Sequence, residues 1–472
     1  MRATPSLPPL LLLSLLAGAP AGATEGPRVT SDTFGALAAR ALGPAVMSGR
    51  ITALDAVPGD PLTLFVGSAS GGVWRSTDGG VTFAPVFDEH PQSIGALRVD
   101  PSDPKTVWVG TGESCVRNSV SIGDGVYRST DGGDSWTHLG LAGTERIAAL
   151  AIDPKQRDTV YVCALGPLWN ASEERGVYRT RDGGKSWEKV LHLDADTGCS
   201  DLAIDPQEPR ILYAGMWTHR RSPDFFRSGG KGSGLYRSAD GGTTWERVST
   251  GLPAGELGRI AVAVAPSRPS VVYAVVEAKK TALYRSDDTG RTWSEGSSGF
   301  NVQARPFYFA HLFVDPRDHD TVYKPGLTLS VSTDGGRSMS GGIGFGASYH
   351  SDVHALWIDP RDPKTIWMGT DGGLYVSRDR AFHWAFVPGL PISQFYHVSV
   401  DSALPYNVYG GLQDNSSWTG PSQSPGGVEN RDWENIGTGD GFWAYADPTD
   451  SDFAYSMYQG ARCCASTGRP AR

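Results

Sequence analysis

The sequence has little of what marks a disulfide framework, a nucleic-acid-binding protein or a membrane protein. Only 5 of its 472 residues are cysteine. Lys and Arg together number 42 against 51 Asp and Glu, and the resulting net charge of −9 argues against a nucleic-acid partner, which would need a broad basic surface. Beyond the first 23 residues, no uncharged apolar run approaches the length of about 18 residues expected of a membrane-spanning helix. We therefore predict no membrane span.

The cysteines are too few and too scattered to hold a small fold together. Cys115, Cys163 and Cys199 lie far apart, whereas Cys463 and Cys464 are adjacent. We predict buried free thiols, with a Cys163–Cys199 disulfide as the alternative.

The chain is instead rich in residues of tight turns and packed sheets, with 60 Gly, 32 Pro and 14 Trp. This composition is typical of many short strands. Residues 1–23 predict a secretory signal peptide, because Arg2 precedes an apolar stretch at residues 7–17 and small residues at 21–23 form a cleavage site. We therefore expect a secreted or periplasmic protein, with residues 24–44 as an N-terminal linker.

The stretch GVYRSTDGGDSW at residues 125–136 represents a pattern, the Asp box, that recurs seven times. Ser and Asp side chains can satisfy the backbone amides of a tight corner, Gly permits a positive φ, and the closing aromatic ring packs between sheets. The interval of 45 to 58 residues is that of a propeller blade. We predict a structural role for the seven Asp-box aspartates, which are Asp78, Asp131, Asp182, Asp240, Asp288, Asp334 and Asp379.

A second repeat consists of an apolar strand, an Asp-Pro turn and another apolar strand, as in IGALRVDPSDPKTVWVG at residues 94–110. Nine such hairpins occur, so each unit contains four strands, A to D, and the predicted fold is an all-β propeller. We place blades 1–7 in residues 45–390 and further, incomplete blades in residues 391–458. Residues 459–472 lose strand alternation and are predicted to be an aberrant or truncated tail. The hairpins fit either a seven-bladed ring followed by the start of a second ring, or one larger ring.

The Asp boxes resemble the BNR repeats of sialidases, sortilin-type receptors and xyloglucan-hydrolysing glycosidases. The segments SGRITALDAVPGDP, SPGGVENRDWENIGTGDGFW and YNVYGGLQDNSSW are similar to large secreted bacterial proteins described as sortilin-N-terminal-like or glycosyl-hydrolase-like. The resemblance runs from about Met47 to Tyr458 and implies the propeller fold, although the Asp box itself is shared by unrelated functions. Because members of that group usually continue further, the resemblance also implies a truncated chain.

The four-strand unit predicts which end of the sheets carries the function. The A–B and C–D turns share one end and are short and uniform, whereas the B–C loops and the residues that lead into strand A share the other end and vary. Variable loops on a rigid scaffold are where binding residues concentrate, and aromatic, arginine and amide side chains suit a sugar or a peptide. The alternative is that these loops cover one another or a neighbouring domain. The candidate ligand-binding residues are Arg50, Glu113, Arg117, Asn118, Trp169, Trp217, Arg220, Gln413, Asp414 and Trp418.

The sequence HSDVH at residues 350–354 is the candidate metal site. In a strand, His350, Asp352 and His354 would project to one face, and two imidazoles with a carboxylate can ligate zinc. Alternate strand residues lie about 6.5–7 Å apart, which is wide for neighbouring ligands, so we favour a hydrogen-bonded polar lining. We predict no cofactor.

Two main classes of function are open, a binding scaffold and a glycoside hydrolase with two carboxylates across a cleft. Xyloglucan-hydrolysing relatives carry a catalytic aspartate in the first-blade B–C turn, where this chain has Ala69. The remaining candidate catalytic carboxylates are Asp371, Asp414 and Asp440. We therefore favour a secreted scaffold that recognises a polypeptide or a carbohydrate over an enzyme, and a structural or assembly module is a third alternative.

Overall fold

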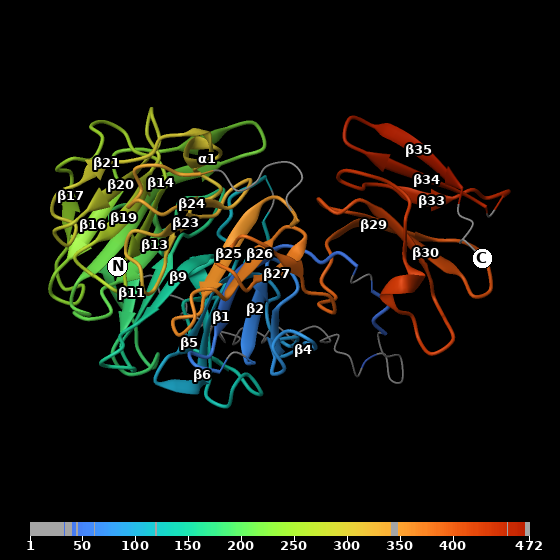
Figure 1. Cartoon of the computed structure of the whole chain (residues 1–472), viewed down its shortest axis with the longest axis horizontal. Coiled ribbons are helices and arrows are strands. Elements are labelled where there is room, and N and C mark those ends of the chain that lie inside the picture. Colours follow the sequence, from blue (N-terminus) through green and yellow to red (C-terminus); the bar gives the residue numbers. More distant parts are fainter. Residues whose placement is uncertain are drawn as a thin grey trace, which may run out of the picture. The chain divides into compact units, whose positions relative to one another are not determined.

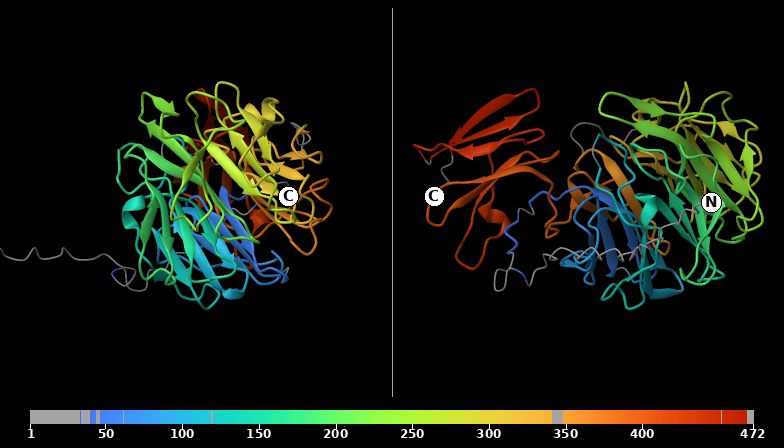
Figure 2. Two further views of the ribbon diagram at one scale, coloured as in Figure 1. Left: turned by 90° about the vertical axis from the view of Figure 1, so that its left-hand side faces the viewer. Right: turned by 180° about the vertical axis from the view of Figure 1, so that it is seen from behind.

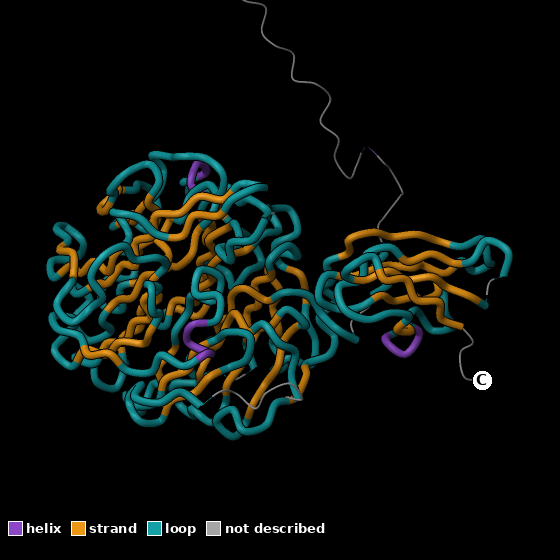
Figure 3. Tube along the Cα trace, turned by 90° about the horizontal axis from the view of Figure 1, so that it is seen from above, coloured by secondary structure: helices purple, strands orange, loops and turns teal. Residues whose placement is uncertain are grey.

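A computed structural model of the protein describes residues 33, 40–43, 46–60, 62–118, 120–340, 348–450 and 452–467. Residues 43–472 form one compact unit. Strands and the loops between them make up nearly all of its described part, and helix is confined to α1 (Phe300–Gln303) and short 3-10 turns (Figure 3). The predicted signal peptide, residues 1–23, and most of the predicted linker fall outside the described residues.

The described strands form nine antiparallel sheets, one for each predicted hairpin (Figure 1). Sheet 1 contains β1 (Ile51–Ala56), β2 (Leu64–Ser68), β3 (Val73–Ser76) and β4 (Ala84–Pro85); sheet 2 contains β5 (Ile94–Asp100), β6 (Asp103–Thr111), β7 (Val126–Ser129) and β8 (Thr137–His138); sheet 3 contains β9 (Ile147–Ile152), β10 (Val160–Ala164), β11 (Gly176–Thr180) and β12 (Glu188–Leu191). Sheet 4 contains β13 (Thr197–Ile204), β14 (Leu212–Arg221), β15 (Phe226–Ser228), β16 (Gly234–Ser238) and β17 (Glu246–Val248); sheet 5 contains β18 (Ile260–Val264), β19 (Val272–Val276), β20 (Ala282–Ser286) and β21 (Ser294–Glu295).

The remaining sheets follow the same order, although two of them have three strands. Sheet 6 contains β22 (Phe313–Val314), β23 (Val322–Lys324) and β24 (Ser330–Ser332); sheet 7 contains β25 (Val353–Ile358), β26 (Ile366–Thr370), β27 (Gly373–Ser377) and β28 (Ala385–Phe386); sheet 8 contains β29 (Phe395–Val400), β30 (Asn407–Leu412), β31 (Ser417–Pro421) and β32 (Glu434–Asn435); sheet 9 contains β33 (Ala444–Ala446), β34 (Phe453–Tyr458) and β35 (Arg462–Thr467). The predicted all-β propeller fold of four-stranded units is confirmed.

The first strands of sheets 1 to 7 line a common channel of about 490 Å³. In the left view of Figure 2 these sheets follow one another from blue through green and yellow to orange. β1 of sheet 1 packs against β25 and β26 of sheet 7, where Ile51 and Leu54 share a buried cluster with Trp367 and Leu374. This packing favours a ring of seven sheets followed by further sheets over one larger ring.

Each Asp box is held by the hydrogen bonds that its residues predict. In the first box, the Ser76 hydroxyl donates to Asp78 Oδ1 at 2.8 Å, and the Thr82 amide and hydroxyl donate to the same carboxylate at 2.9 and 2.5 Å. These hydrogen bonds, above all the one from the Thr82 hydroxyl, lower the pKa of Asp78 to about 2. The arrangement recurs at the other six aspartates, with His383 in place of the hydroxyl at the seventh: Asp131, Asp182, Asp240, Asp288, Asp334 and Asp379.

Every Asp box is also joined to the A–B turn of its own sheet. The amide of Gly79 donates to the Leu62 carbonyl, and the amide of Gly132 donates to the Lys105 carbonyl. Both kinds of turn therefore share one end of each sheet, which we call the Asp-box end. The B–C loops lie at the opposite end, which we call the loop end.

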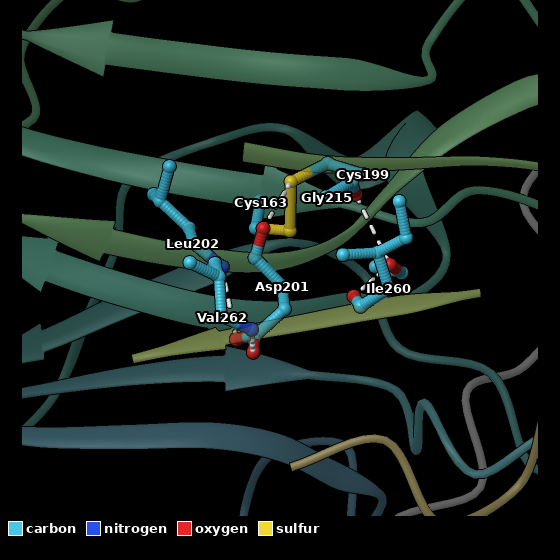
Figure 4. The surroundings of a disulfide bond; sticks show 8 residues. Cys163, Cys199, Asp201, Leu202, Gly215, Ile260 and Val262 are labelled. Atoms are coloured by element: carbon cyan, nitrogen blue, oxygen red, sulfur yellow. Dashed lines mark hydrogen bonds between the residues drawn. A yellow bond between two sulfur atoms is a disulfide. The ribbon is translucent and has the colours of Figure 1, made fainter. Parts of the chain in front are cut away.

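The prediction that Cys163 and Cys199 are free thiols is wrong. These residues form the disulfide that was the alternative (Figure 4). Cys163 lies on β10 and Cys199 on β13 of the next sheet, with Cα atoms 5.0 Å apart, a separation that a disulfide spans. Packing of two sheets brings them together across 36 residues of sequence, which spacing alone does not reveal. Beside the disulfide, Asp201 accepts a hydrogen bond from the Val262 amide of sheet 5 (Figure 4).

Strand structure extends into residues 459–472, the predicted aberrant or truncated tail. Residues Arg462–Thr467 form β35, which pairs antiparallel with β34. Three residues, Gln459 to Ala461, form the turn between them, and Gly460 and Ala461 have positive φ of 77° and 55°. The turn and the backbone pairing specify this strand without a clear alternation of side chains.

Candidate functional site

The loop end brings together charged side chains that lie far apart in the sequence. Arg50 precedes β1, Glu113 follows β6, Asp371 lies between β26 and β27, and Asp414 follows β30. A cavity of about 290 Å³ opens among these segments, and we call it the loop-end cavity. Its lining consists of Arg50, Val116, Arg117, Arg221, Arg305, Phe307, Tyr308, Asp352, Asp371, Gln413, Asp414 and Asp440.

A buried ion pair between Arg50 and Asp371 forms the base of this cavity. The Nε and Nη2 atoms of Arg50 each donate to a different oxygen of Asp371 at 2.6 Å, and both side chains are 4% exposed. Planar two-point pairing of this kind fixes the orientation of both groups. Sheet 1 and sheet 7 thus meet through a rigid, oriented contact.

His354 completes the surroundings of Asp371. Its Nε2 lies 2.7 Å from Asp371 Oδ1, and its Nδ1 lies 3.5 Å from Cys115 Sγ. Burial would raise the pKa of Asp371, but the charges of His354 and Arg50 outweigh burial and hold it well below its ordinary value. Burial would lower the pKa of His354, but Asp371 outweighs burial and raises it to about 10. Both groups are therefore charged at neutral pH, and Asp371 positions its neighbours.

A second buried carboxylate, Glu113, is shared by two arginines. Glu113 Oε2 accepts a hydrogen bond from Arg117 Nη2 at 2.9 Å, and its Oε1 lies 3.5 Å from Arg50 Nη1. Arg117 also donates to Gln413 Oε1 at 3.2 Å. This chain of contacts links sheets 1, 2 and 8 around the loop-end cavity.

Asp414 is the carboxyl group of this network that remains accessible. One of its oxygens lies 3.2 Å from Arg50 Nη2, and its side chain is 26% exposed. Its backbone amide donates to Asp440 Oδ1 at 2.7 Å. Burial, followed by the charge of Asp371, raises the pKa of Asp414 to about 8, and the charge of Arg50 only partly offsets this rise. At neutral pH Asp414 can therefore donate a proton or a hydrogen bond at the cavity surface.

The predicted ligand-binding residues divide into two groups. Arg50, Arg117, Gln413 and Asp414 line the loop-end cavity, and Glu113 lies behind them. The Asn118 side chain accepts a hydrogen bond from Arg221, which lines the same cavity.

The predicted aromatic contacts do not gather there. Trp217 is fully buried, stacked on His219 at 4.3 Å between ring centroids and covered by Arg259. Trp418 is also buried. Trp169 is exposed but does not line the cavity, and Arg220 pairs with Asp196. A strand that packs against another sheet buries its large aromatic rings. Counting the aromatic residues in a loop sequence therefore overestimates how many of them a ligand can contact.

The candidate metal ligands His350, Asp352 and His354 do not converge. β25 begins at Val353, and Asp352 has a left-handed φ of 60°, so the alternation that would align the three side chains is absent. His354 contacts Asp371, whereas His350 Nε2 contacts the Asp414 carbonyl at 3.0 Å. Across the described ranges, no group of three His, Cys, Asp or Glu side chains is placed to hold a metal ion.

Sequence reasoning missed the cavity wall contributed by Arg305, Phe307 and Tyr308. These residues lie between α1 and β22, in a stretch longer than a tight turn. Tyr308 is buried, and Arg305 lies over its ring at 5.6 Å. The signal was present in the cluster of aromatic residues beside an arginine, immediately ahead of the strand A of unit 6.

Comparison with known proteins agrees with the propeller fold. Residues 71–213 match the family described as Sortilin, neurotensin receptor 3. A probable oligoxyloglucan-reducing end-specific xyloglucanase of Neosartorya fischeri is 31% identical over 131 residues, which is 26% of this chain and 14% of that protein. A xyloglucanase of a Paenibacillus species is 27% identical over 222 residues, or 40% of this chain and 20% of that protein. The matches thus span at most a fifth of these two relatives' lengths.

A solved structure supports the same fold. The crystal structure of an ancestral GH74 enzyme superposes with a TM-score of 0.54 at 14% identity, over 91% of this chain and 69% of that one. In the part of the chain that the structure describes, no helix is long and apolar enough to cross a membrane. The predicted resemblance to the sortilin-type and xyloglucanase-like propeller group is confirmed, and the chain is similar to glycoside-hydrolase-related propellers.

Proposed function

We propose that the protein is a binding scaffold that holds a glycan in the loop-end cavity. The observation that carries this proposal is the cavity itself, which is lined by arginine, carboxyl, amide and aromatic groups from several sheets. Such groups hydrogen-bond sugar hydroxyls and stack on pyranose rings. Similarity to proteins named xyloglucanases favours a carbohydrate over a polypeptide.

Binding without cleavage is the simpler function for this site. Both oxygens of Asp371 are occupied by Arg50 and His354, and Ala69 stands where xyloglucan-hydrolysing relatives carry an aspartate. Asp371 therefore has no free oxygen with which to act as a base or a nucleophile. The network instead presents fixed hydrogen-bonding groups to a ligand.

Glycoside hydrolysis is the second candidate, and the raised pKa of Asp414 favours it. A protonated carboxyl group beside an ionised one is the arrangement that general acid catalysis of glycoside cleavage needs. Asp414 would protonate the glycosidic oxygen. Asp440, which accepts a hydrogen bond from the Asp414 amide, would orient the attacking water molecule.

A glycan array followed by product analysis tests both candidates. We expect binding of a defined glycan without release of shorter products, and loss of that binding in Gln413→Ala and Asp414→Ala. Phe382→Ala, an exposed aromatic at the Asp-box end, is the matched control. Cleavage that Asp414→Asn abolishes would replace the scaffold proposal with hydrolysis, whereas absence of any glycan binding would refute both.

A further inference from the structure

Two arginines of the loop-end cavity have no carboxylate partner. Arg221 and Arg305 both line the cavity, and within the described residues neither has an acidic oxygen in ion-pair range. We propose that these two guanidinium groups bind the carboxylate of an acidic sugar, so that the ligand is a uronate-containing glycan. This inference deepens the proposed function and rests on it.

Arg221 is held in place by neutral contacts. Its Nη2 donates to the Asn118 side chain, and its guanidinium lies 4.9 Å from the centre of the Phe226 ring. Asn118 and Phe226 come from sheets 2 and 4, so two separate segments fix the position of the arginine. Both contacts leave its positive charge uncompensated.

Arg305 faces the same cavity from the segment between α1 and β22. Its φ of 47° lies in the left-handed region, which is unusual for a residue other than glycine. Its guanidinium lies over the Tyr308 ring at 5.6 Å, and its side chain is exposed. An aromatic face supports a cation without neutralising it as a carboxylate would.

The other two arginines of the cavity already have ion-pair partners. Arg50 pairs with Asp371 and Glu113, and Arg117 pairs with Glu113. Asp440 accepts hydrogen bonds from the Asp414 amide and from Gln459. Arg221 and Arg305 are therefore the arginines of the lining that form no ion pair with a described residue. Burial raises the pKa of Asp352, and the charge of Arg305 acts against this rise. A carboxylate is the group that matches a planar guanidinium best.

Asp352 explains why the anion would belong to a sugar. Its Oδ1 atom is buried at the cavity and accepts no hydrogen bond from the described residues. A sugar acid offers hydroxyl donors beside its carboxylate, so one ligand can satisfy both Asp352 and the two arginines. A simple anion would leave the carboxylate oxygen of Asp352 without a donor.

Isothermal titration with matched oligosaccharides tests the inference. The probes are oligogalacturonate and its methyl ester, which has the same sugar backbone without the charge, together with neutral xyloglucan oligosaccharides. We expect the acid to bind on the order of tenfold or more tightly than its ester, as loss of a charge-assisted contact predicts. Arg221→Gln/Arg305→Gln should remove this preference, and Arg227→Gln, an exposed arginine of β15 outside the cavity lining, should keep it.

The outcomes separate the inference from the proposed function. Equal affinity for acid, ester and neutral glycans would overturn the acidic-sugar inference and leave glycan binding intact. Binding of a carboxylate-bearing peptide, but of no glycan, would overturn both, as would binding of none of the probes. A preference for the acid that survives in the double variant would overturn the assignment to Arg221 and Arg305. The circular dichroism and unfolding midpoint of that variant should match the native protein, because Arg305 is exposed and neither arginine forms an ion pair.

Discussion

The two ends of the sheets are built by different means. At the Asp-box end, the hydrogen bonds that shape each turn join residues only a few positions apart in the sequence. Ser76 and Thr82, for example, both donate to the Asp78 carboxylate. At the loop end, the contacts join residues hundreds of positions apart, as Arg50 and Asp371 do across 321 positions. The first end repeats seven times, whereas the second occurs once.

The difference teaches that the repeated structural turns and the candidate binding site lie at opposite ends of the sheets. Loss of one Asp box leaves six others. Each box keeps its own turn together, and its carbonyls also accept hydrogen bonds from the preceding sheet, as Gly132 does from Arg75 and Gly183 from Arg128. Loss of one side chain in the loop-end network leaves each group that it contacted without that hydrogen-bond or ion-pair partner.

The largest effect is expected for Arg50→Ala. Removing the guanidinium leaves Asp371 and Glu113 buried without their shared partner, and breaking a buried ion pair in this way costs about 3–5 kcal/mol of unfolding free energy. Urea unfolding followed by tryptophan fluorescence measures the change. Arg157→Ala is the control, because Arg157 pairs with Asp103 but is 50% exposed, and its loss should cost less than about 1 kcal/mol. Equal effects of the two substitutions would contradict the contrast.

Reduction of the Cys163–Cys199 disulfide is expected to have the next largest effect. The disulfide lies near the loop end of β10 and β13 and closes a loop across 36 residues, for which the chain-entropy relation predicts about 3–4 kcal/mol. The measurement is the unfolding free energy of Cys163→Ala/Cys199→Ala against the native protein, with the exposed-thiol substitution Cys463→Ser as the control. A double variant as stable as the native protein would show that sheet packing alone holds this joint.

The raised pKa of Asp414 predicts a dependence of stability on pH. Asp414 has a folded pKa of about 8 and an unfolded pKa near 3.8, so the folded state retains a proton that the unfolded state has lost, and stability falls as pH rises from about 4 to 8. One such proton contributes a slope of at most about 1.4 kcal/mol per pH unit.

His354, with a folded pKa of about 10, adds a fall in stability above about pH 6.5. The measurement is therefore the difference in unfolding free energy between the native protein and Asp414→Asn across pH 4–8. Parallel curves would mean that Asp414 is ionised throughout this range.

The smallest effect is expected for Asp240→Ala at the Asp-box end. The substitution removes the acceptor for Ser238, Thr243 and Thr244, and these groups can turn to water because the turn is exposed, so we expect a loss of about 1 kcal/mol. Ligand affinity at the loop end should stay unchanged. A change in affinity comparable to that of Asp414→Ala would show that the two ends are coupled.

The Asp-box turns could be predicted almost completely from the sequence because the hydrogen bonds that shape each turn are local. The motif Ser-x-Asp-Gly-Gly specifies a hydrogen-bonded turn through contacts among its own residues and their immediate neighbours. In the first box, Asp78 accepts hydrogen bonds from the Ser76 hydroxyl and the Val81 amide, as expected. The A–B hairpins could be predicted for the same reason. Even at the far end of the chain, however, the β34–β35 hairpin escaped prediction, since its turn rather than its side-chain pattern specifies it.

The loop end could be predicted only in part. The B–C loops were recognised as the variable segments, and Arg50, Arg117, Gln413 and Asp414 do meet there. Their pairing depends on how the sheets pack around the channel, which no local pattern encodes. The same limit explains the burial of Trp217 and the pairing of Cys163 with Cys199.

The packing of β1 against β25 has a topological consequence. The backbone passes directly from one sheet to the next at six joints of the ring, but sheets 7 and 1 meet without such a connection. Sheets 7 and 1 are therefore held together by contacts between the strands rather than by a connecting segment of chain. Arg50 and Asp371 lie on opposite sides of this junction, so a ligand that contacted both residues would add a further non-covalent link between the first and the seventh sheet.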